Sequence, residues 1–225
     1  MPTKTELPSL RGRFLTFEGV DGCGKSTQAA LVADRIERAG VPVVRTREPG
    51  GTNTGRALRR ILLEPEYRGL AAQAELLLFL ADRVQHLQEL IRPALERGAV
   101  VVCDRFHDAT VAFQRYARNL DFAQIQPWID SNIRPMPDLT VWLDVGLDLA
   151  MKRLHAREGL GAGTAASGAL TRLELEPSAF HQRVRAGYGA IAEADPARVI
   201  RIDGAGSIEA VHETIWAQIA GRFQV

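Results

Sequence analysis

A glycine-rich stretch near the start of the chain constrains the fold more than any other feature. Residues 19–26 read GVDGCGKS, which fits the pattern G-x-x-x-x-G-K-[ST] between a β-rich segment and a helical one. Glycines let such a loop turn tightly and point its backbone N–H groups at phosphate oxygens. The sequence therefore predicts a phosphate-binding loop (P-loop) that joins a strand to a helix. The alternative is an ordinary glycine-rich turn.

Short β-rich runs alternate with longer helical patterns along the rest of the chain. The expected strands are residues 13–18, 42–47, 99–104, 139–145 and 198–203. The third is continuously apolar, so we expect it to be covered on both faces and to lie centrally. Helices are expected after Lys25, from about residue 73 to 97, and from 207 to 223. The alternation predicts an α/β, three-layer P-loop NTPase fold with a five-stranded parallel sheet flanked by helices.

Composition limits the number of domains and the class of partner. The 225 residues, 46% apolar and 24% charged, fit a single domain over residues 1–225. A formal net charge of +1 creates no field that attracts nucleic acid or an anionic membrane, so a bound anion must be met locally. No apolar run has the length of a signal peptide or a membrane helix. We expect a cytoplasmic protein with no membrane and no nucleic-acid partner.

The P-loop residues have individual expected roles in binding ATP. Lys25 should reach the β- and γ-phosphates, and Ser26 should offer its hydroxyl to Mg²⁺. Cys23 lies at a helix N-terminus, a setting that lowers a thiol pKa, so we expect it to be alkylated and to be protected by ATP. The expected ATP-binding residues are Gly19, Val20, Asp21, Gly22, Cys23, Gly24, Lys25, Ser26 and Thr27.

An acid–arginine pair closes the third expected strand. Parallel sheets place ligands at the carboxyl ends of their strands, so Asp104 and Arg105 should lie near the P-loop. Asp104 could orient Mg²⁺ and its waters, and the Arg105 guanidinium could bind a phosphate in fork geometry. The alternative is a salt bridge at the strand end.

Three motifs together resemble those of the thymidylate kinase family. They are Phe17-Glu18-Gly19 before the P-loop, REPGGT at residues 47–52, and Asp104-Arg105-Phe106. Residues 76–85 (LLLFLADRVQ) resemble the family's substrate helix, and the arginines around residues 153 to 172 resemble its lid. The resemblance covers nearly the whole chain. It implies transfer of the γ-phosphoryl group of ATP to dTMP, and a homodimer.

The same resemblance implies a nucleoside pocket. Phe79 would stack on thymine and Arg83 would donate to its O4, since residues four apart share a helix face. Arginine has no acceptor and cytosine carries an amino group at that position, so Arg83 should disfavour cytosine. Taken alone, Phe79 would be a core residue and Arg83 a surface charge or salt-bridge partner. The implied substrate-binding residues are Asp21, Glu48, Pro49, Phe79, Arg83, Arg105, Thr110, Phe113 and Gln114.

Arginines after the fourth expected strand are predicted to close over the reacting phosphate. We place a lid at about residues 153–174 and interpret the small residues 159–168 as a mobile flap. Because the P-loop has no basic residue beyond Lys25 and phosphoryl transfer needs cations, Arg157 and Arg172 are the expected suppliers. The alternative is ordinary helix-surface charge. The expected catalytic residues are Lys25, Asp104, Arg105, Arg157 and Arg172.

Two other functions fit the motifs less well. A P-loop alone also occurs in other small kinases, such as deoxynucleoside kinases, and in nucleotide-dependent switches. The sequence contains no N-K-x-D base-reading motif, and residues 203–206 match D-x-x-G in a place better explained as a turn. The acceptor that stimulates turnover would separate these functions. Sequence does not distinguish ATP from GTP.

Overall fold

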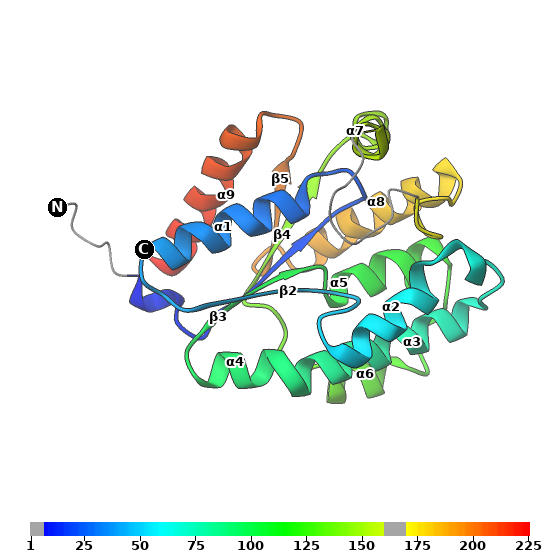
Figure 1. The fold of residues 1–225 in the computed structure, drawn as a ribbon, viewed down its shortest axis with the longest axis horizontal. Coiled ribbons are helices and arrows are strands. Elements are labelled where there is room, and N and C mark those ends of the chain that lie inside the picture. Colours follow the sequence, from blue (N-terminus) through cyan, green and yellow to red (C-terminus); the bar gives the residue numbers. More distant parts are fainter. Residues whose placement is uncertain (1–6, 160–169) are drawn as a thin grey trace.

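The computed structural model describes residues 7–159 and 170–225, and a five-stranded sheet forms its centre (Figure 1). The strands are β1 (Phe14–Glu18), β2 (Val43–Arg47), β3 (Val100–Asp104), β4 (Leu139–Asp144) and β5 (Val199–Asp203). Every strand pair is parallel, and the order is β2-β3-β1-β4-β5. The expected strands and the parallel sheet are therefore confirmed. β3 is an interior strand, although β1 occupies the middle position.

Helices cover both faces of the sheet. They are α1 (Lys25–Arg38), α2 (Asn53–Leu63), α3 (Ala72–His86), α4 (Arg92–Glu96), α5 (His107–Thr110), α6 (Gln126–Asn132), α7 (Leu147–Gly159), α8 (Ser178–Ala194) and α9 (Ile208–Phe223). Short 3₁₀ turns lie at Pro8–Leu10 and Pro65–Tyr67. A π-helical segment, Leu87–Ile91, joins α3 to α4, so the expected long helix is present with altered hydrogen bonding. A second π-helical segment, Val111–Ala117, continues α5.

Two apolar cores account for the three layers. On one face of the sheet, Leu15 and Phe17 belong to the larger core, which includes Val32 of α1 and Ile215 of α9. On the other face, Phe14 packs with residues of α3, α4 and α6. Figure 1 shows the same arrangement, with α1 and α9 on one side and α3, α4 and α6 on the other. β1 and β4 are buried at every position because helices cover both of their faces.

Side-chain caps mark two helix starts next to the sheet edge. Thr52 accepts from the Gly55 N–H at 2.9 Å and begins α2, and Ser207 accepts from the Ala210 N–H at 3.2 Å and begins α9. The helix expected from residue 207 is thus confirmed. Both helices start at the end of the sheet where the strands finish, which places their first turns beside the candidate site.

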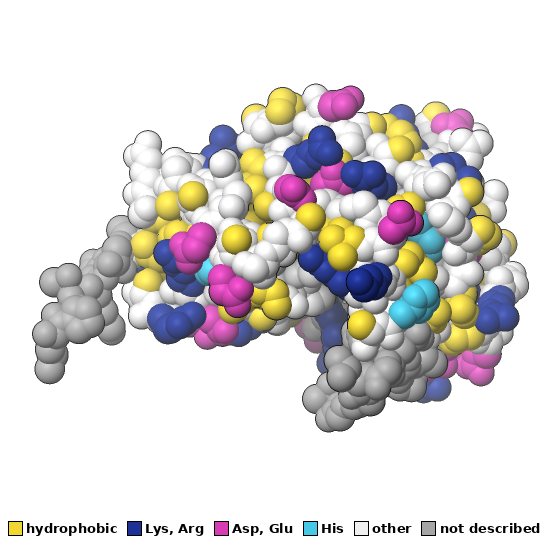
Figure 2. Space-filling model, turned by 90° about the horizontal axis from the view of Figure 1, so that it is seen from above, with side chains coloured by type: hydrophobic (Ala, Val, Ile, Leu, Met, Phe, Trp, Pro, Cys, Tyr) yellow, Lys and Arg dark blue, Asp and Glu magenta, His cyan; other side chains and the backbone are white. Residues whose placement is uncertain are grey.

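The described residues carry mixed surface charge. On the face shown in Figure 2, basic and acidic side chains are interspersed, in keeping with the net charge of +1. Within residues 7–159 and 170–225, no helix combines the length and the apolar character that crossing a bilayer requires.

The expected flap at residues 159–168 falls almost entirely outside the described residues, and the single-domain organisation stays a prediction.

Candidate active site

The P-loop packs against the start of α7 and opens onto the N-terminus of α1. Gly22 has a φ of 81°, and a Cβ there would lie 2.1 Å from the Ala150 carbonyl oxygen, so only glycine fits. Gly24, with a φ of 98°, precedes the first residue of α1, and no side chain of the described residues caps that helix. The first-turn N–H groups are therefore available to an anion, which the helix field also favours.

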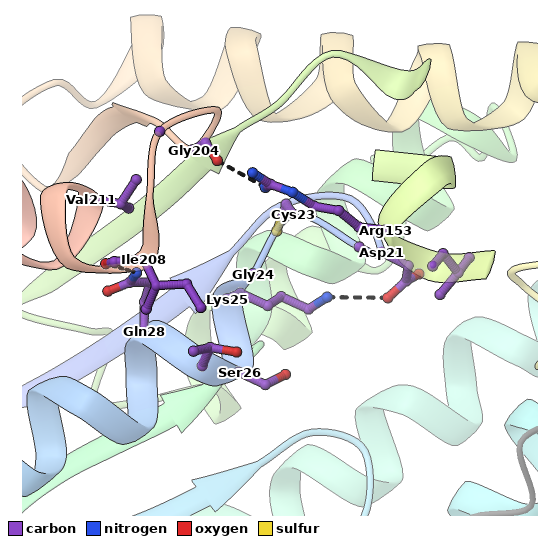
Figure 3. Close-up of a pocket in the computed structure, with 14 residues that line it drawn as sticks. Asp21, Cys23, Gly24, Lys25, Ser26, Gln28, Arg153, Gly204, Ile208 and Val211 are labelled. Atoms are coloured by element: carbon purple, nitrogen blue, oxygen red, sulfur yellow. Dashed lines mark hydrogen bonds and ion pairs between the residues drawn. The ribbon is translucent and has the colours of Figure 1, made fainter. Parts of the chain in front are cut away.

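A pocket of about 440 Å³ lies over this loop (Figure 3). The loop forms one wall, and Arg153 and Leu154 of α7 face residues that follow β5. Its lining residues are Asp21, Gly22, Cys23, Gly24, Lys25, Ser26, Thr27, Gln28, Arg153, Leu154, Gly204, Gly206, Ile208 and Val211. The pocket joins phosphate-binding groups to an apolar wall, a combination that suits a nucleotide. Of the expected ATP-binding residues, Gly19 and Val20 are not among those lining it.

Asp21 holds two cations at one side of the loop. Its Oδ1 lies 3.1 Å from the Lys25 Nζ and 2.8 Å from the Arg105 Nη2. Burial raises the pKa of Asp21, but Lys25 and Arg105 outweigh it and hold the pKa well below its usual range. Burial and Arg105 lower the pKa of Lys25, while Asp21 and Asp104 contribute to a net rise. The cluster is therefore fully ionised at neutral pH.

Arg105 connects the P-loop to Tyr188 of α8. Its backbone is left-handed, with a φ of 70°, and its Nη1 donates to the Tyr188 hydroxyl at 3.0 Å. Tyr188 donates to the buried Glu18 at 2.7 Å, and Glu18 also accepts from the Phe106 N–H at 2.7 Å. The guanidinium lies over the Phe113 ring, 5.0 Å from its centroid. Burial raises the pKa of Glu18 to about 7, against the pull of Arg105.

Asp104 and Ser26 form a suitable site for Mg²⁺. The Ser26 hydroxyl donates to the Asp104 Oδ2. The Asp104 Oδ1 is buried and finds no hydrogen-bond partner among the described residues. Mg²⁺ in nucleotide sites is held by one or two carboxylates together with the phosphates, so an unsatisfied carboxylate oxygen beside a P-loop hydroxyl fits this ion. The structure thus places the two residues expected to bind Mg²⁺ next to each other.

Arg83 of α3, which is expected to bind the base, is buried. Arg83 is 1% exposed, so it is not a surface charge. Its Nε donates to Glu48, its Nη1 to the Thr110 hydroxyl and its Nη2 to the Phe106 carbonyl, each at 2.8 Å. These bonds use three of five N–H donors, so two remain for a ligand. Phe79 is only partly buried, which leaves part of its ring free for stacking.

The loop after β2 supports that arginine. Glu48 accepts from Arg83 through Oε2 and from the His86 Nδ1 through Oε1 at 2.9 Å, so its carboxylate fixes both side chains. The Glu48–Pro49 peptide is cis, and the Pro49 carbonyl accepts from the Arg59 Nη1 at 2.8 Å. Thr110, Phe113 and Gln114 are also buried. Of the expected substrate residues, hydrogen bonds thus join Glu48, Arg83 and Thr110.

Comparison with known proteins identifies the family. A family model described as thymidylate kinase matches residues 17–215. The chain belongs to the thymidylate kinase family. A thymidylate kinase of Solidesulfovibrio magneticus is 49% identical over 212 residues, spanning 92% of this chain and 98% of that protein. One of Trichormus variabilis is 44% identical over 206 residues, spanning 91% and 93%.

A solved structure supports the same assignment. The crystal structure of thymidylate kinase from Ehrlichia chaffeensis matches with a TM-score of 0.71 at 33% identity, covering 92% of this chain and 98% of that chain. Membership of the thymidylate kinase family confirms the resemblance and the α/β P-loop fold expected from the sequence.

The lid arginines have different environments in this member of the thymidylate kinase family. Arg172 is buried: its Nη1 lies 2.6 Å from the Glu75 Oε2, and its Nε and Nη2 donate to the Leu62 carbonyl. Its donors are thus directed at α2 and α3. The side chain of Arg157 and residues 160–169 lie outside the described part. Arg153 donates to the Gly204 carbonyl at 2.9 Å, inside the pocket of Figure 3.

The expectation of a reactive Cys23 is wrong. The side chain is 2% exposed, and burial raises the pKa of its thiol despite the opposing effect of Lys25. The helix N-terminus would lower the pKa only of a thiol that faced the anion site. Here the Sγ points back into the larger apolar core, which favours the neutral thiol.

Sequence reasoning gave no role to several residues that the structure brings to the site. Glu18 is the last residue of β1 and residues 204–206 follow β5, so the rule that placed Asp104 at the site could have found them. Arg59 on α2 has no such signal. Arg56 and Arg60 lie within three residues of it, and the sequence does not show which of the three arginines faces the site. Burial and Arg47 lower the pKa of Arg59, and its charged neighbours include Asp104 and Arg105. Arg59 is thus a further cation of the site.

Proposed function

We propose that the chain transfers the γ-phosphoryl group of ATP to the 5′-phosphate of dTMP, giving dTDP and ADP, a step of dTTP biosynthesis. The observation that carries this proposal is the position of Arg105. It is bound to Asp21 of the P-loop and lies over Phe113 of the expected nucleoside pocket. One guanidinium therefore borders both the donor pocket and the acceptor site, which is where two phosphates must meet.

The residues on the ATP side bind the phosphates and neutralise their charge. Lys25 and the P-loop N–H groups bind the β- and γ-phosphates, and Arg105 binds the acceptor phosphate with Arg59 close by. Ser26 and Asp104 would hold Mg²⁺, which supplies charge neutralisation to the phosphates when bound. Transfer is direct and in line, so the protein contributes position and charge rather than a covalent intermediate. An ionised phosphate acceptor requires no general base.

The residues of the acceptor side select the nucleoside. Phe79 stacks on the base, and an unused N–H of Arg83 donates to thymine O4. Cytosine would present an amino group to the same donor, which leaves both unpaired. Asp21 contacts the sugar 3′-hydroxyl, while Glu48, Pro49, Thr110 and Gln114 line the remaining walls, as the family resemblance implies. Phe113 lacks a hydroxyl, so it excludes a 2′-substituent by size alone.

The lid, the assembly and the location belong to the same proposal. Arg157 on α7 supplies charge to the γ-phosphoryl group, and Arg172 would do so only after exchanging Glu75 and Leu62 for a phosphate. A homodimer and a cytoplasmic location rest on family membership, and sedimentation velocity over a range of concentrations tests the dimer. A second function, phosphorylation of another nucleoside or nucleotide, would use the same donor pocket.

The acceptor decides between these functions. ADP release coupled to a reporter is measured with dTMP, thymidine and dCMP side by side, with ATP and Mg²⁺ constant. We expect dTMP to give the largest kcat/KM. A larger rate with thymidine would indicate a deoxynucleoside kinase, and slow turnover that no acceptor stimulates would indicate a nucleotide-dependent switch.

A further inference from the structure

Glu75 is a fully buried carboxylate to which the proposed mechanism gives no role. It lies in the first turn of α3 and is 0% exposed. Its Oε1 accepts from the Gln114 Nε2 at 2.9 Å. Arg118 and Arg172 bind the same carboxylate at 3.2 and 2.6 Å. A buried anion with two cations and an amide is a costly arrangement to assemble, so its geometry calls for an explanation.

The position of Glu75 relates it to the expected base. Glu75, Phe79 and Arg83 are spaced by four residues on α3, so they form one stripe along the helix. Arg83 donates to Thr110, and Glu75 accepts from Gln114, one turn further along the facing segment. These two cross-links bracket Phe79, the side chain on which the base would stack. The Gln114 amide is therefore bound one helical turn before Phe79 on α3, and the Arg83 guanidinium lies one turn after it.

Glu75 dictates which way the Gln114 amide points. A carboxylate only accepts hydrogen bonds, whereas an amide has an accepting oxygen and a donating nitrogen. Gln114 must consequently turn Nε2 toward Glu75 and Oε1 away from it. Oε1 accepts no hydrogen bond from any described residue. Burial raises the pKa of Glu75, but the bonds from Arg118 and Gln114 outweigh it and lower the pKa, so the carboxylate stays ionised.

We propose that Glu75 is a positioning residue for base selection, because it fixes the Gln114 Oε1 as an acceptor for the N3–H of a 4-oxopyrimidine. Thymine and uracil carry a proton on N3, whereas cytosine carries a lone pair there. Arg83 would select at the exocyclic position, and Glu75, acting through Gln114, would select at the neighbouring ring nitrogen. The inference rests on the proposed function and deepens it.

Glu75→Gln tests the inference, because a glutamine at this position can either donate or accept and no longer fixes the amide of Gln114. We measure kcat/KM for dTMP, dUMP and dCMP. The ratio of dTMP to dCMP should fall by roughly tenfold or more, the size of a lost base-reading contact. The ratio of dTMP to dUMP should stay within about twofold, because both bases carry N3–H. A general loosening of the pocket would change both ratios together.

Arg118→Gln is the matched control. It removes one cation from Glu75 and leaves the carboxylate as an acceptor, so both ratios should be retained. If Glu75→Gln does not fold, Glu75→Gln/Arg118→Gln removes one charge of each sign and is compared with Arg118→Gln alone. Wild-type protein without dTMP-stimulated ADP release would overturn the proposed function and this inference together. Active wild type with an unchanged dTMP to dCMP ratio in the Glu75 variants, or an equal fall in Arg118→Gln, would overturn this inference alone.

Discussion

At the scale of single residues, Asp21 shows how a phosphate site can contain an acid. A carboxylate beside a phosphate is repulsive, but this one is shared by Lys25 and Arg105. It holds the two cations next to each other, a position that mutual repulsion would otherwise oppose. Orientation of the cations before the nucleotide arrives lowers the entropy lost on binding. The same principle, a buried carboxylate fixing a functional cation, recurs where Glu48 holds Arg83.

Arg83→Ala should change substrate choice more than ATP binding. The side chain is distant in sequence from the P-loop and is bound to Glu48, Thr110 and Phe106 rather than to donor-pocket residues. We expect discrimination between dTMP and dCMP to fall by roughly 1–3 kcal/mol. The free energy of unfolding should also fall, because Glu48 loses a buried partner. Steady-state kinetics with both acceptors and thermal melts check this, and an unaltered ratio would remove Arg83 from the base site.

Both cysteines should be unreactive in the folded protein. Cys23 and Cys103 are buried free thiols whose pKa values are raised by burial. We expect a thiol-specific chromogenic reagent to label them slowly in buffer and fully in guanidinium chloride, and ATP to give little further protection. Rapid labelling of Cys23 in buffer, located by peptide mass, would show that the thiol reaches the nucleotide path.

At the scale of elements, the P-loop packs tightly against the first turn of α7 at Gly22. Gly22→Ala would place a methyl group 2.1 Å from the Ala150 carbonyl oxygen. Gly24→Ala is the matched control, since its φ is also positive but nothing lies within 4 Å of the added carbon. Both should lose about 1 kcal/mol of unfolding free energy from backbone strain. Gly22→Ala should lose clearly more, because α7 must move. Denaturant titration compares the unfolding free energies of the two variants. Equal losses would mean that α7 moves away from the added methyl group without a loss of stability.

The two lid arginines should respond differently to truncation. Arg157→Ala is expected to depress kcat far more than it raises the KM for dTMP, because its charge acts in the transition state. Arg172→Ala should depress kcat and also lower the unfolding free energy, by up to roughly 3–5 kcal/mol, because Glu75 loses a buried ion pair. Kinetics and denaturant titration are run on the same preparations. If both variants keep kcat within about threefold, the catalytic charge comes from elsewhere.

At the scale of the whole molecule, the free energy of unfolding should depend on pH through Asp82, in the same direction as through Glu18, whose pKa is also raised. Burial, with Glu48 nearby, raises the pKa of Asp82 from 3.8 to about 6. Its Oδ1 accepts from the Gly50 N–H, and its Oδ2 has no hydrogen-bond partner among the described residues. Because the folded-state value is the higher one, the folded protein binds this proton more tightly. The stabilisation is fully present below about pH 4 and is lost as pH rises through about 6.

Asp82→Asn isolates that contribution. The amide cannot titrate, so the difference in unfolding free energy between wild type and variant should depend on pH. Between pH 4 and 7 it should change by at most about 3 kcal/mol, with the wild type becoming less stable relative to the variant as pH rises. The difference removes the effect of acids with lowered pKa, such as Asp21 and Asp144, which act in the opposite direction. A flat difference curve would show that Asp82 is ionised throughout this range.

Local sequence determined the elements of this protein and the motifs of its site. Strand and helix patterns depend on neighbours within a few residues, so the five strands and the P-loop were predictable. Asp104 and Arg105 were also predictable, because the carboxyl ends of parallel strands meet at one edge of the sheet.

Only the tertiary structure decided the partners of the charged side chains. Arg105 meets Tyr188, which lies 83 residues further along the chain, and Arg172 meets the Leu62 carbonyl, 110 residues away. Cys23 faces the core although its local setting suggests a reactive thiol. Such outcomes depend on which elements pack together and on burial, which changes the cost of each charge. A local sequence pattern indicates neither which elements pack together nor how deeply a side chain is buried.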